Sequence, residues 1–289
     1  MPITETQLTR RAKNLGSSDL PAICGVSPWT TAYDVWLDKT GRLEPLDDAS
    51  APLVVGTYME SAILDWASRD GGLGALRRNQ ERRVAGTPIL CHIDAVLAGG
   101  DPVEVKTAGL FGPLAPEWGE PGTDEIPDSV TIQCHAHMLA TDADVCHVAA
   151  LLGGRGLVLY AVPLTATLGA ALIARAAEFW ALVESDTPPP QTLPTLEAIK
   201  RVRREPSSVV SLDWSAVQTY ESLQANAKAA AQAADDAKRV VLAALGTAEA
   251  GDLPNGRRVT YYEQTRKAYA VKETTSRVMR ITKPKESKT

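Results

Sequence analysis

The order of hydrophobic and polar residues predicts helices first, strands in the middle and helices again later in the chain. Early segments space their apolar residues three or four positions apart, as on one face of a helix, whereas residues 91–106 alternate with the two-residue period of strands. The predicted helices cover residues 5–15, 20–24, 31–38, 54–68, 129–140, 168–184 and 213–246. The predicted strands lie within 91–106 and at 145–152 and 157–162, and Asn255-Gly256 marks a terminal hairpin. This order indicates a mixed α/β (α+β) core with a helical arm and a hairpin.

Two segments without helix or strand periodicity divide the chain. Residues 109–127 are rich in Gly, Pro and acidic residues, and they form a loop long enough to suggest a functional role. The run Pro188-Pro-Pro190 ends the helix before it sharply. We therefore expect two domains, residues 1–190 and 191–289.

The overall composition is that of an ordinary globular protein. The chain has 289 residues, of which 44% are hydrophobic and 22% charged. It has no run of about 18 apolar residues, so we expect no membrane span. The first residues lack the basic and apolar blocks of a signal peptide, which predicts a cytoplasmic protein, in the host cell if a phage encodes it.

The cysteines leave one alternative open. Three of the four precede a histidine, in Cys91-His92, Cys134-His135 and Cys146-His147. A soft-metal or iron–sulfur site is one interpretation, and small buried side chains beside incidental histidines is the other. Cluster-binding cysteines normally stand close together in sequence, and no Cys-x-x-Cys spacing occurs here, which favours the second interpretation.

Charge is distributed unevenly along the chain. The formal net charge is −5, which argues against a surface coated with basic residues. Basic residues nevertheless cluster at 77–83, at 200–204 and from 266 to 288, while acidic residues concentrate between 34 and 48. This segregation would allow a local positive groove on an acidic body, as in a nucleic-acid enzyme.

The clearest candidate chemistry lies in the predicted hairpin, whose turn is Ala98-Gly-Gly-Asp101. Side chains two apart in a strand point to one face, so Glu104 and Lys106 project together while Val103 and Val105 point into a core. With Asp94 on the neighbouring strand, two carboxylates and one ammonium could meet. Such a group suits a divalent metal with hard oxygen ligands beside a fixed positive charge, and it can hydrolyse a phosphodiester. The alternative is a Glu-x-Lys pair on a solvent-exposed strand face, which is common and carries no function.

These residues stand within an ordered series of motifs. The series is Gly16-Ser-Ser-Asp, Ser27-Pro-Trp with Tyr33 and Trp36, Gly56-Thr-x-x-Glu60, Asp94, Glu104-x-Lys106, Thr123-Asp-Glu-Ile-Pro127, Gln133 with Met138, Glu178-Phe-Trp180 and Pro188-Pro-Pro. It resembles the YqaJ-like viral recombinase family, the phage lambda exonuclease type within the PD-(D/E)xK nuclease superfamily. The resemblance covers residues 10–190, and the later arm and hairpin are similar to that family's C-terminal extension.

The resemblance implies a fold, a reaction and partners. The nuclease domain, residues 1–190, would have a restriction-endonuclease-like core, with a central mixed β-sheet flanked by helices. The implied activity is magnesium-dependent hydrolysis of phosphodiester bonds at double-stranded DNA ends, 5′ to 3′, with Mn²⁺ able to substitute. The single-stranded tail would serve phage-type recombination by strand annealing. The implied partners are a single-strand annealing protein and further copies of the chain in a ring, with three as the expected number.

The resemblance also implies roles for the residues of the hairpin. Asp94 and Glu104 would bind Mg²⁺ together with the carbonyl of Val105. Lys106 would hold or deprotonate the attacking water and offset the charge that builds on the phosphate.

Further roles follow for residues on the predicted helices. Glu60 would be an additional acid near the metal, with Asp65 as the competing carboxylate. Gln133 would lie at the rim of the site and orient Lys106 or the substrate. Glu60 could instead be one exposed helix carboxylate among several.

Substrate binding is implied for the first motif. Ser18 in the Gly-Ser-Ser-Asp turn, with Arg11, would contact the terminal 5′ phosphate. The alternatives are that Ser18 only caps a helix and that the adjacent Arg10 replaces Arg11. Trp29, Tyr33 and Trp36 are expected in the core, and Trp118 in the long loop is the aromatic residue expected to contact DNA.

Two positions depart from the family pattern. Val130 stands where a tyrosine commonly follows the Ile-Pro segment, and His135 replaces the second glutamine of a Gln-x-Gln helix, so we assign His135 to substrate binding. Neither change removes a metal ligand. The competing functions are an endonuclease or iron–sulfur exonuclease of the same superfamily, and a DNA-end-binding or assembly protein with a vestigial nuclease site.

Overall fold

The computed structural model describes residues 10, 12–45, 51–109, 114–190, 192–265 and 279. The chain divides into two compact units, Met1–Arg203 and Arg204–Thr289. The predicted helix at 5–15 and the basic tail from 266 fall largely outside the described residues.

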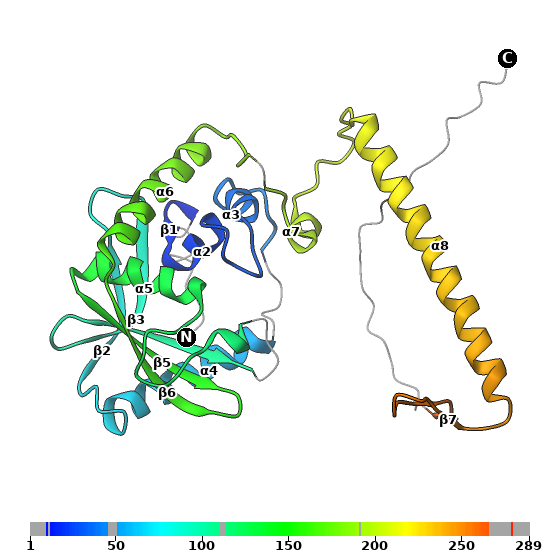
Figure 1. The fold of residues 1–289 in the computed structure, drawn as a ribbon. Helices are drawn as coiled ribbons and strands as arrows, with labels where there is room; N and C mark the ends of the chain where they lie inside the picture. Colours follow the sequence, from blue (N-terminus) through cyan, green and yellow to red (C-terminus); the bar gives the residue numbers. More distant parts are fainter. Residues whose placement is uncertain are drawn as a thin grey trace, which may run out of the picture. The chain divides into compact units, whose positions relative to one another are not determined.

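A mixed sheet forms the centre of the first unit (Figure 1). Its strands are β1 (Leu15–Gly16), β2 (Leu76–Arg83), β3 (Ile89–Leu97), β4 (Pro102–Ala108), β5 (Val145–Leu152) and β6 (Gly156–Pro163). The strand order is β1-β3-β4-β5-β6, with β2 paired to β3. β4 runs parallel to β5, whereas the β3–β4 and β5–β6 pairs are antiparallel. The predicted hairpin at 98–101 and the mixed α/β class are therefore confirmed.

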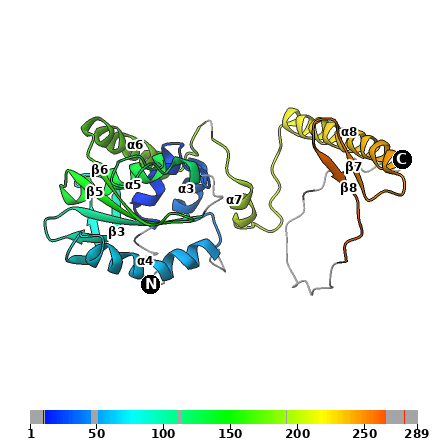
Figure 2. The ribbon, with the colours of Figure 1, turned by 60° about the horizontal axis from the view of Figure 1, so that its bottom comes forward.

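Helices cover both faces of this sheet (Figure 2). They are α2 (Leu20–Ile23), α3 (Ala32–Lys39), α5 (Asp128–Thr141) and α6 (Ala166–Glu184) on one face and α4 (Ala51–Arg69) on the other. Ile93 and Phe179 belong to the core under the first group, and Ile63 packs with Val103 under α4. Of the described helices, α6 alone is long and apolar enough to cross a membrane, and its Leu172, Ala176 and Phe179 are buried in the core.

The edge of β3 that faces β4 is shared by two strands. β1 pairs with β3 at residues 89–90, and β4 pairs with it at 95–96, while β2 occupies the opposite edge. Residues 91–94 of β3 therefore lie where β1 and β4 separate, and we call this opening the fork. The fork matters because it leaves backbone groups of β4 available to side chains.

β2 is a strand that the sequence did not predict. Its residues, Leu-Arg-Arg-Asn-Gln-Glu-Arg-Arg, show no apolar alternation, and Asn79 has a left-handed backbone with φ 53°. The strand pairs with β3 alone, and its side chains are exposed or half-buried. Ladder hydrogen bonds to β3 hold such an outer strand without a hydrophobic face of its own.

The described part of the long loop is fixed against β6. Arg155 donates to the carbonyls of Trp118 and Gly119 at 2.8 and 2.5 Å, and Gly122 N donates to Leu159 O at 2.8 Å. Trp118 is 8% exposed, and its ring lies 5.4 Å from that of Tyr160. The expectation that Trp118 contacts DNA is therefore wrong, because the side chain fills the core instead.

The first unit extends past the proline run. The short helix α7 (Leu196–Arg201) is followed by a bridge between Val202 and Leu43. Thr195 N donates to the buried Asp34 carboxylate at 2.8 Å, and Glu44 N donates to Arg201 O at 2.7 Å. These contacts join residues up to 203 to the first unit, beyond the boundary expected at 190.

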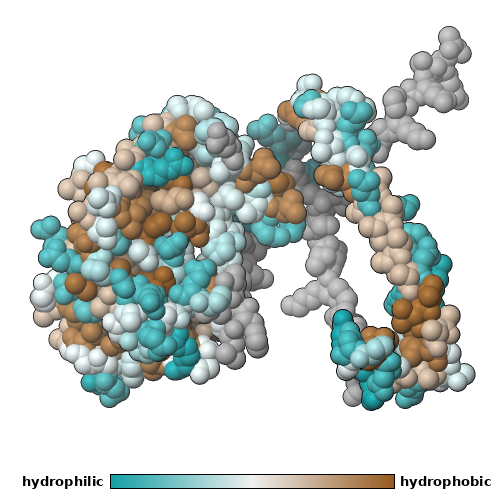
Figure 3. Space-filling view, in the orientation of Figure 1, coloured by the Kyte–Doolittle hydropathy of each residue, from teal (hydrophilic) through white to brown (hydrophobic). Residues whose placement is uncertain are grey.

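The second unit consists of a long helix and a small hairpin. The elements are α8 (Trp214–Leu245), β7 (Ala250–Asp252) and β8 (Arg258–Thr260). Asp213 caps α8, and the turn at Asn255-Gly256 joins the two strands as predicted. None of the α8 residues is buried, and large hydrophobic side chains such as Leu223 and Val240 are exposed. Figure 3 shows hydrophobic residues at the surface of this helix.

Candidate active site

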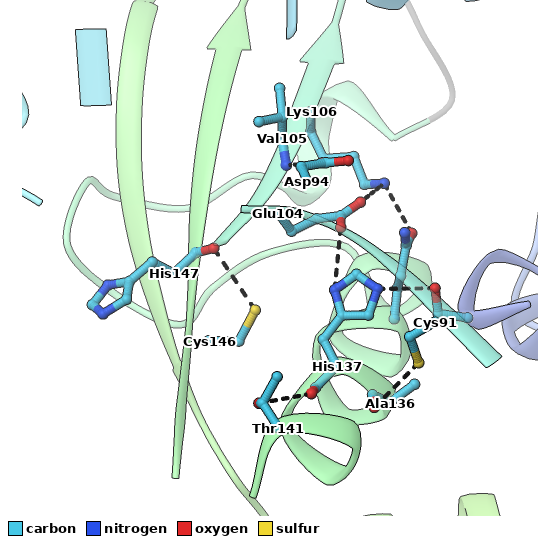
Figure 4. A network of polar contacts seen from close by, with 12 residues as sticks. Cys91, Asp94, Glu104, Val105, Lys106, Ala136, His137, Thr141, Cys146 and His147 are labelled. Carbon is cyan, nitrogen blue, oxygen red and sulfur yellow. Dashed lines mark hydrogen bonds and ion pairs between the residues drawn. The ribbon is translucent and has the colours of Figure 1, made fainter. Parts of the chain in front are cut away.

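The fork brings together the charged residues of the predicted hairpin (Figure 4). Lys106 Nζ pairs with Glu104 Oε1 and also donates to Gln133 Oε1 on α5 at 2.9 Å. Glu104 is 2% exposed, so the pair does not lie on a solvent-exposed strand face. The structure thus brings the buried Glu104 together with the half-buried Lys106 and Gln133 in one polar cluster.

Asp94 joins this cluster through the backbone. Regular pairing of β3 with β4 reaches only as far as Ala95 and Val103, and beyond it the strands separate. Val105 N, which lacks a β3 carbonyl partner there, donates to Asp94 Oδ2 at 2.7 Å. The Asp94 carboxylate is therefore held beside β4 at the fork.

The strand period separates the polar cluster from a hydrophobic one. Val103 is fully buried in the cluster under α4, and Val105 packs at its edge. Glu104 and Lys106 project from the other face of β4, toward α5. The predicted division of this strand into a chemical face and a core face is therefore what the structure shows.

Burial and like charge act together on Asp94. Burial, reinforced by the nearby Glu104 carboxylate, raises the pKa of Asp94 well above its usual range, and Lys106 only partly offsets this. Burial alone would lower the pKa of Lys106, but the charge and hydrogen bond of Glu104, together with the charge of Asp94, outweigh it, so that pKa is raised. The lysine stays protonated, and the two carboxylates share one positive charge.

These residues fit a hard divalent cation. Glu104 Oε2 is buried and has no hydrogen-bond partner within the described residues. Two carboxylates and the carbonyl of Val105 are oxygen donors of the kind that Mg²⁺ prefers, and Mg²⁺ usually keeps several waters beside one or two carboxylates. No group of three or more His, Cys, Asp or Glu side chains is arranged for a metal in the described ranges.

Glu60 lies close enough to influence this site. It is half-buried on α4, and its charge adds to the rise in the pKa of Asp94. The competing carboxylate, Asp65, is instead paired with Arg78 of β2 at 2.5 Å, which lowers the pKa of Asp65. The structure therefore separates the two acids that the sequence left as alternatives.

The Gly-Ser-Ser-Asp turn lies on the other side of the fork. Asp19 accepts from Gly16 N at 2.8 Å and pairs with the buried Lys39 at 2.7 Å, which fixes the turn. Ser17 is buried and Ser18 is exposed. Arg11, the second residue assigned to the 5′ phosphate, lies outside the described residues.

Two histidines of α5 have different surroundings. His135, assigned to substrate binding from the sequence, is buried, with Nδ1 2.9 Å from Thr131 O and Nε2 accepting from Thr165 N at 3.1 Å. Both of its ring nitrogens are occupied by backbone groups, so the structure does not bring it to the carboxylates. His137, which the sequence did not single out, lies 3.3 Å from Glu104 Oε2 through Nδ1. Its position four residues after Gln133, on the same helix face, was the available signal.

The cysteines behave as buried small side chains. Burial, reinforced by the Glu104 charge, raises the pKa of Cys91 to about 12, and burial also raises the pKa of Cys146 well above its usual range. Neighbouring residues in a strand point to opposite faces, so Cys91 is buried while His92 is exposed. This arrangement separates each strand cysteine from its histidine, and it favours small buried side chains over a soft-metal or iron–sulfur site.

Comparison with known proteins agrees with this geometry. The family model described as "YqaJ-like viral recombinase domain" matches residues 7–144. This part of the chain is similar to a YqaJ-like viral recombinase domain. It is 28% identical over 151 residues to the uncharacterized protein YqaJ of Bacillus subtilis (strain 168), an alignment of 51% of this chain and 46% of that protein. The match thus spans less than half of that relative's length.

Solved structures of low sequence identity share the fold of the YqaJ-like domain. An alkaline exonuclease from Laribacter hongkongensis, LHK-Exo, is 13% identical with a TM-score of 0.50, covering 63% of this chain and 94% of that chain. Its complex with dAMP is 12% identical with a TM-score of 0.51 and the same coverage. At this identity the likeness establishes the fold, a nuclease fold of the restriction-endonuclease type, as expected.

Proposed function

We propose that this protein is a magnesium-dependent exonuclease that hydrolyses phosphodiester bonds at double-stranded DNA ends. The observation that carries the proposal is the cluster of the buried Glu104 with the half-buried Asp94 and Lys106 at the fork, in which two carboxylates share one ammonium. The match of residues 7–144 to the YqaJ-like domain model and the likeness of the fold to that of an alkaline exonuclease support the same reaction.

The residues of the cluster divide the chemistry among them. Asp94, Glu104 and the carbonyl of Val105 would hold Mg²⁺, or Mn²⁺ in its place, with Glu60 as an additional acid nearby. The cation supplies Lewis-acid stabilisation of the phosphate when it is bound. Lys106, oriented by Glu104 and Gln133, holds the attacking water and offsets negative charge on the phosphate.

The finer features of the proposal concern the substrate and the partners. Ser18 is exposed on the fixed turn beside the fork, where it would contact a terminal 5′ phosphate together with Arg11. Degradation would run 5′ to 3′ and leave a single-stranded tail for a strand-annealing protein. Copies of the chain would form a ring, as a trimer, around the DNA in the cytoplasm of the cell. Residues 191–289 would serve as an extension of the nuclease domain.

Digestion of labelled linear duplex DNA tests this function. The full chain is incubated with magnesium and with DNA labelled separately at the 5′ and 3′ ends, beside covalently closed circles, and Asp94→Ala serves as the inactive control. Early release of 5′ label with intact circles is the expected result. Nicked circles would indicate an endonuclease, and end binding in calcium without cleavage in magnesium would indicate an end-binding protein with a vestigial site. Cleavage by Asp94→Ala at the wild-type rate would contradict the assignment of the site.

A further inference from the structure

A buried histidine that the proposed reaction does not use contacts the catalytic cluster. His137 is 0% exposed on α5, one turn after Gln133. Its Nε2 lies 2.9 Å from Ser17 Oγ, and its Nδ1 lies 3.3 Å from Glu104 Oε2. Ser17 belongs to the turn that follows β1, whereas Glu104 lies on β4. Figure 4 shows the ring of His137 facing the Glu104 carboxylate. His137 therefore connects the two sides of the fork.

The hydrogen-bonding capacities of Ser17, His137 and Glu104 determine which group donates and which accepts. A neutral imidazole has one N–H donor and one acceptor nitrogen, and a carboxylate can only accept. The ring must therefore direct Nδ1–H toward Glu104, and Nε2 must accept from the Ser17 hydroxyl. The Ser17 hydroxyl thus selects the ring tautomer that suits Glu104.

The contact between His137 and Glu104 involves two atoms without other partners. In the described part of the chain, Glu104 Oε2 and His137 Nδ1 are both buried and lack a hydrogen-bond partner of good geometry. Glu104 Oε2 is an acceptor and His137 Nδ1–H is a donor, so each atom can serve as the hydrogen-bond partner of the other. The second Glu104 oxygen, Oε1, is already held by Lys106. Contacts at both oxygens define the orientation of the carboxylate.

We propose that His137, oriented by Ser17, is a positioning residue that holds the Glu104 carboxylate for cation binding. The inference rests on the proposed function, in which Glu104 is a metal ligand. It assigns a role to Ser17 that differs from that of its exposed neighbour Ser18. The turn beside the substrate and the carboxylate that binds the cation are linked through one imidazole ring.

Calorimetric titration of the full chain with Mn²⁺, without DNA, tests the inference. We expect His137→Ala to weaken Mn²⁺ binding by about 10- to 100-fold, the usual effect of removing a group that orients a metal ligand. His137→Asn retains an N–H near the position of Nδ1 and should recover most of the affinity. Ser17→Ala should give a smaller loss. Thr141→Val is the matched control, because Thr141 Oγ1 donates to His137 O at 2.9 Å on the same helix without contacting Glu104.

The outcomes separate this inference from the proposed function. Wild-type affinity in His137→Ala would overturn the inference, and so would equal losses in His137→Asn and Thr141→Val that follow their melting temperatures. If His137→Ala does not fold, Mn²⁺ affinity is compared between Ser17→Ala and Thr141→Val. A greater loss in Ser17→Ala supports the inference, and equal losses overturn it. A wild-type chain that binds Mn²⁺ but cleaves no DNA would contradict the nuclease function while leaving the positioning role to be judged by titration. A wild-type chain that binds no Mn²⁺ would overturn both.

Discussion

Two strands of the same sheet, β4 and β2, carry charged side chains in opposite surroundings. On β4, Glu104 is buried, its Oε2 has no hydrogen-bond partner among the described groups, and Lys106 is held by two side chains. On β2, Arg82 is exposed and donates to groups of its own strand, and Glu81 pairs with Arg10 and His92. The comparison teaches that burial of a charge, rather than the number of charges, distinguishes a site from a solvated surface.

The position of each strand in the sheet explains this difference. β4 lies between β3 and β5 and is covered by helices on both faces, so its charged side chains must find partners in the interior. β2 pairs with β3 alone, and water solvates its side chains. An exposed ion pair contributes about 0–1 kcal/mol to stability. Removing one partner of a buried pair costs about 3–5 kcal/mol.

The largest difference between the strands should appear in catalysis. We expect Glu104→Gln to lower the rate of magnesium-dependent DNA cleavage by at least about 10²–10³-fold, because the change removes a charged ligand and the partner of Lys106. Glu81→Gln on β2 is the matched control and should change the rate less than about twofold. Steady-state rates on end-labelled duplex measure both. Comparable losses of cleavage rate in the two variants would contradict the assignment of the active site to β4 rather than β2.

The next effect concerns stability. Lys106→Met should lower the free energy of unfolding by about 2 kcal/mol in magnesium-free buffer, between the values for exposed and buried pairs, because the buried Glu104 and the half-buried Asp94 lose their shared cation. Urea unfolding of the variant and of the wild type at neutral pH measures the change. An unchanged free energy of unfolding would show that solvent, rather than Lys106, compensates the carboxylates.

The pH dependence of stability sharpens the role of Asp94. The pKa of this carboxyl is raised in the folded protein, so the folded state keeps a proton that the unfolded state has lost. Stability without metal should therefore fall as pH rises from the ordinary aspartate pKa toward the raised one, and it should level off above that value. Asp94→Asn should flatten this slope in urea unfolding measured between about pH 4 and pH 8. An identical slope in the variant would assign the effect to other groups.

The smallest effect is expected on β2. Arg82→Ala removes an exposed side chain whose partners are Gln80 Oε1 and a backbone carbonyl of its own strand. The free energy of unfolding should change by no more than about 0.5 kcal/mol, and kcat should be unaffected. Urea unfolding and saturating cleavage assays measure these quantities. A loss as large as that of Lys106→Met would show that β2 is part of the site.

Local patterns in the sequence were sufficient to predict many elements. The alternation around Asp94 and Glu104 predicted the β3–β4 hairpin, because two segments with a two-residue period on either side of a Gly-rich turn are typical of paired strands. Helix spacing predicted α5 and therefore placed Gln133 on a helix. β2 was not predicted, because its residues pair with β3 but do not alternate between apolar and polar as strand residues usually do.

Local patterns likewise predicted some of the site residues and not others. The order of motifs indicated Asp94, Glu104, Lys106 and Gln133 together, and the last three are in direct contact. Trp118 was assigned to DNA because loop position suggested exposure, whereas Arg155 and Tyr160, distant in sequence, hold it in the core.

The sequence by itself determined the residues that face each other within one element and across one tight turn. Strand and helix periods are properties of the local backbone, so the shared face of Glu104 and Lys106 required no knowledge of the rest of the chain. Only the tertiary structure decided which of two histidines, 135 or 137, meets Glu104, and whether Asp65 or Glu60 lies near Asp94. Those choices depend on how α4 and α5 are rotated against the sheet and on where β1 and β4 separate along β3. Burial of side chains distributed over the whole domain sets these rotations, and no local pattern records them.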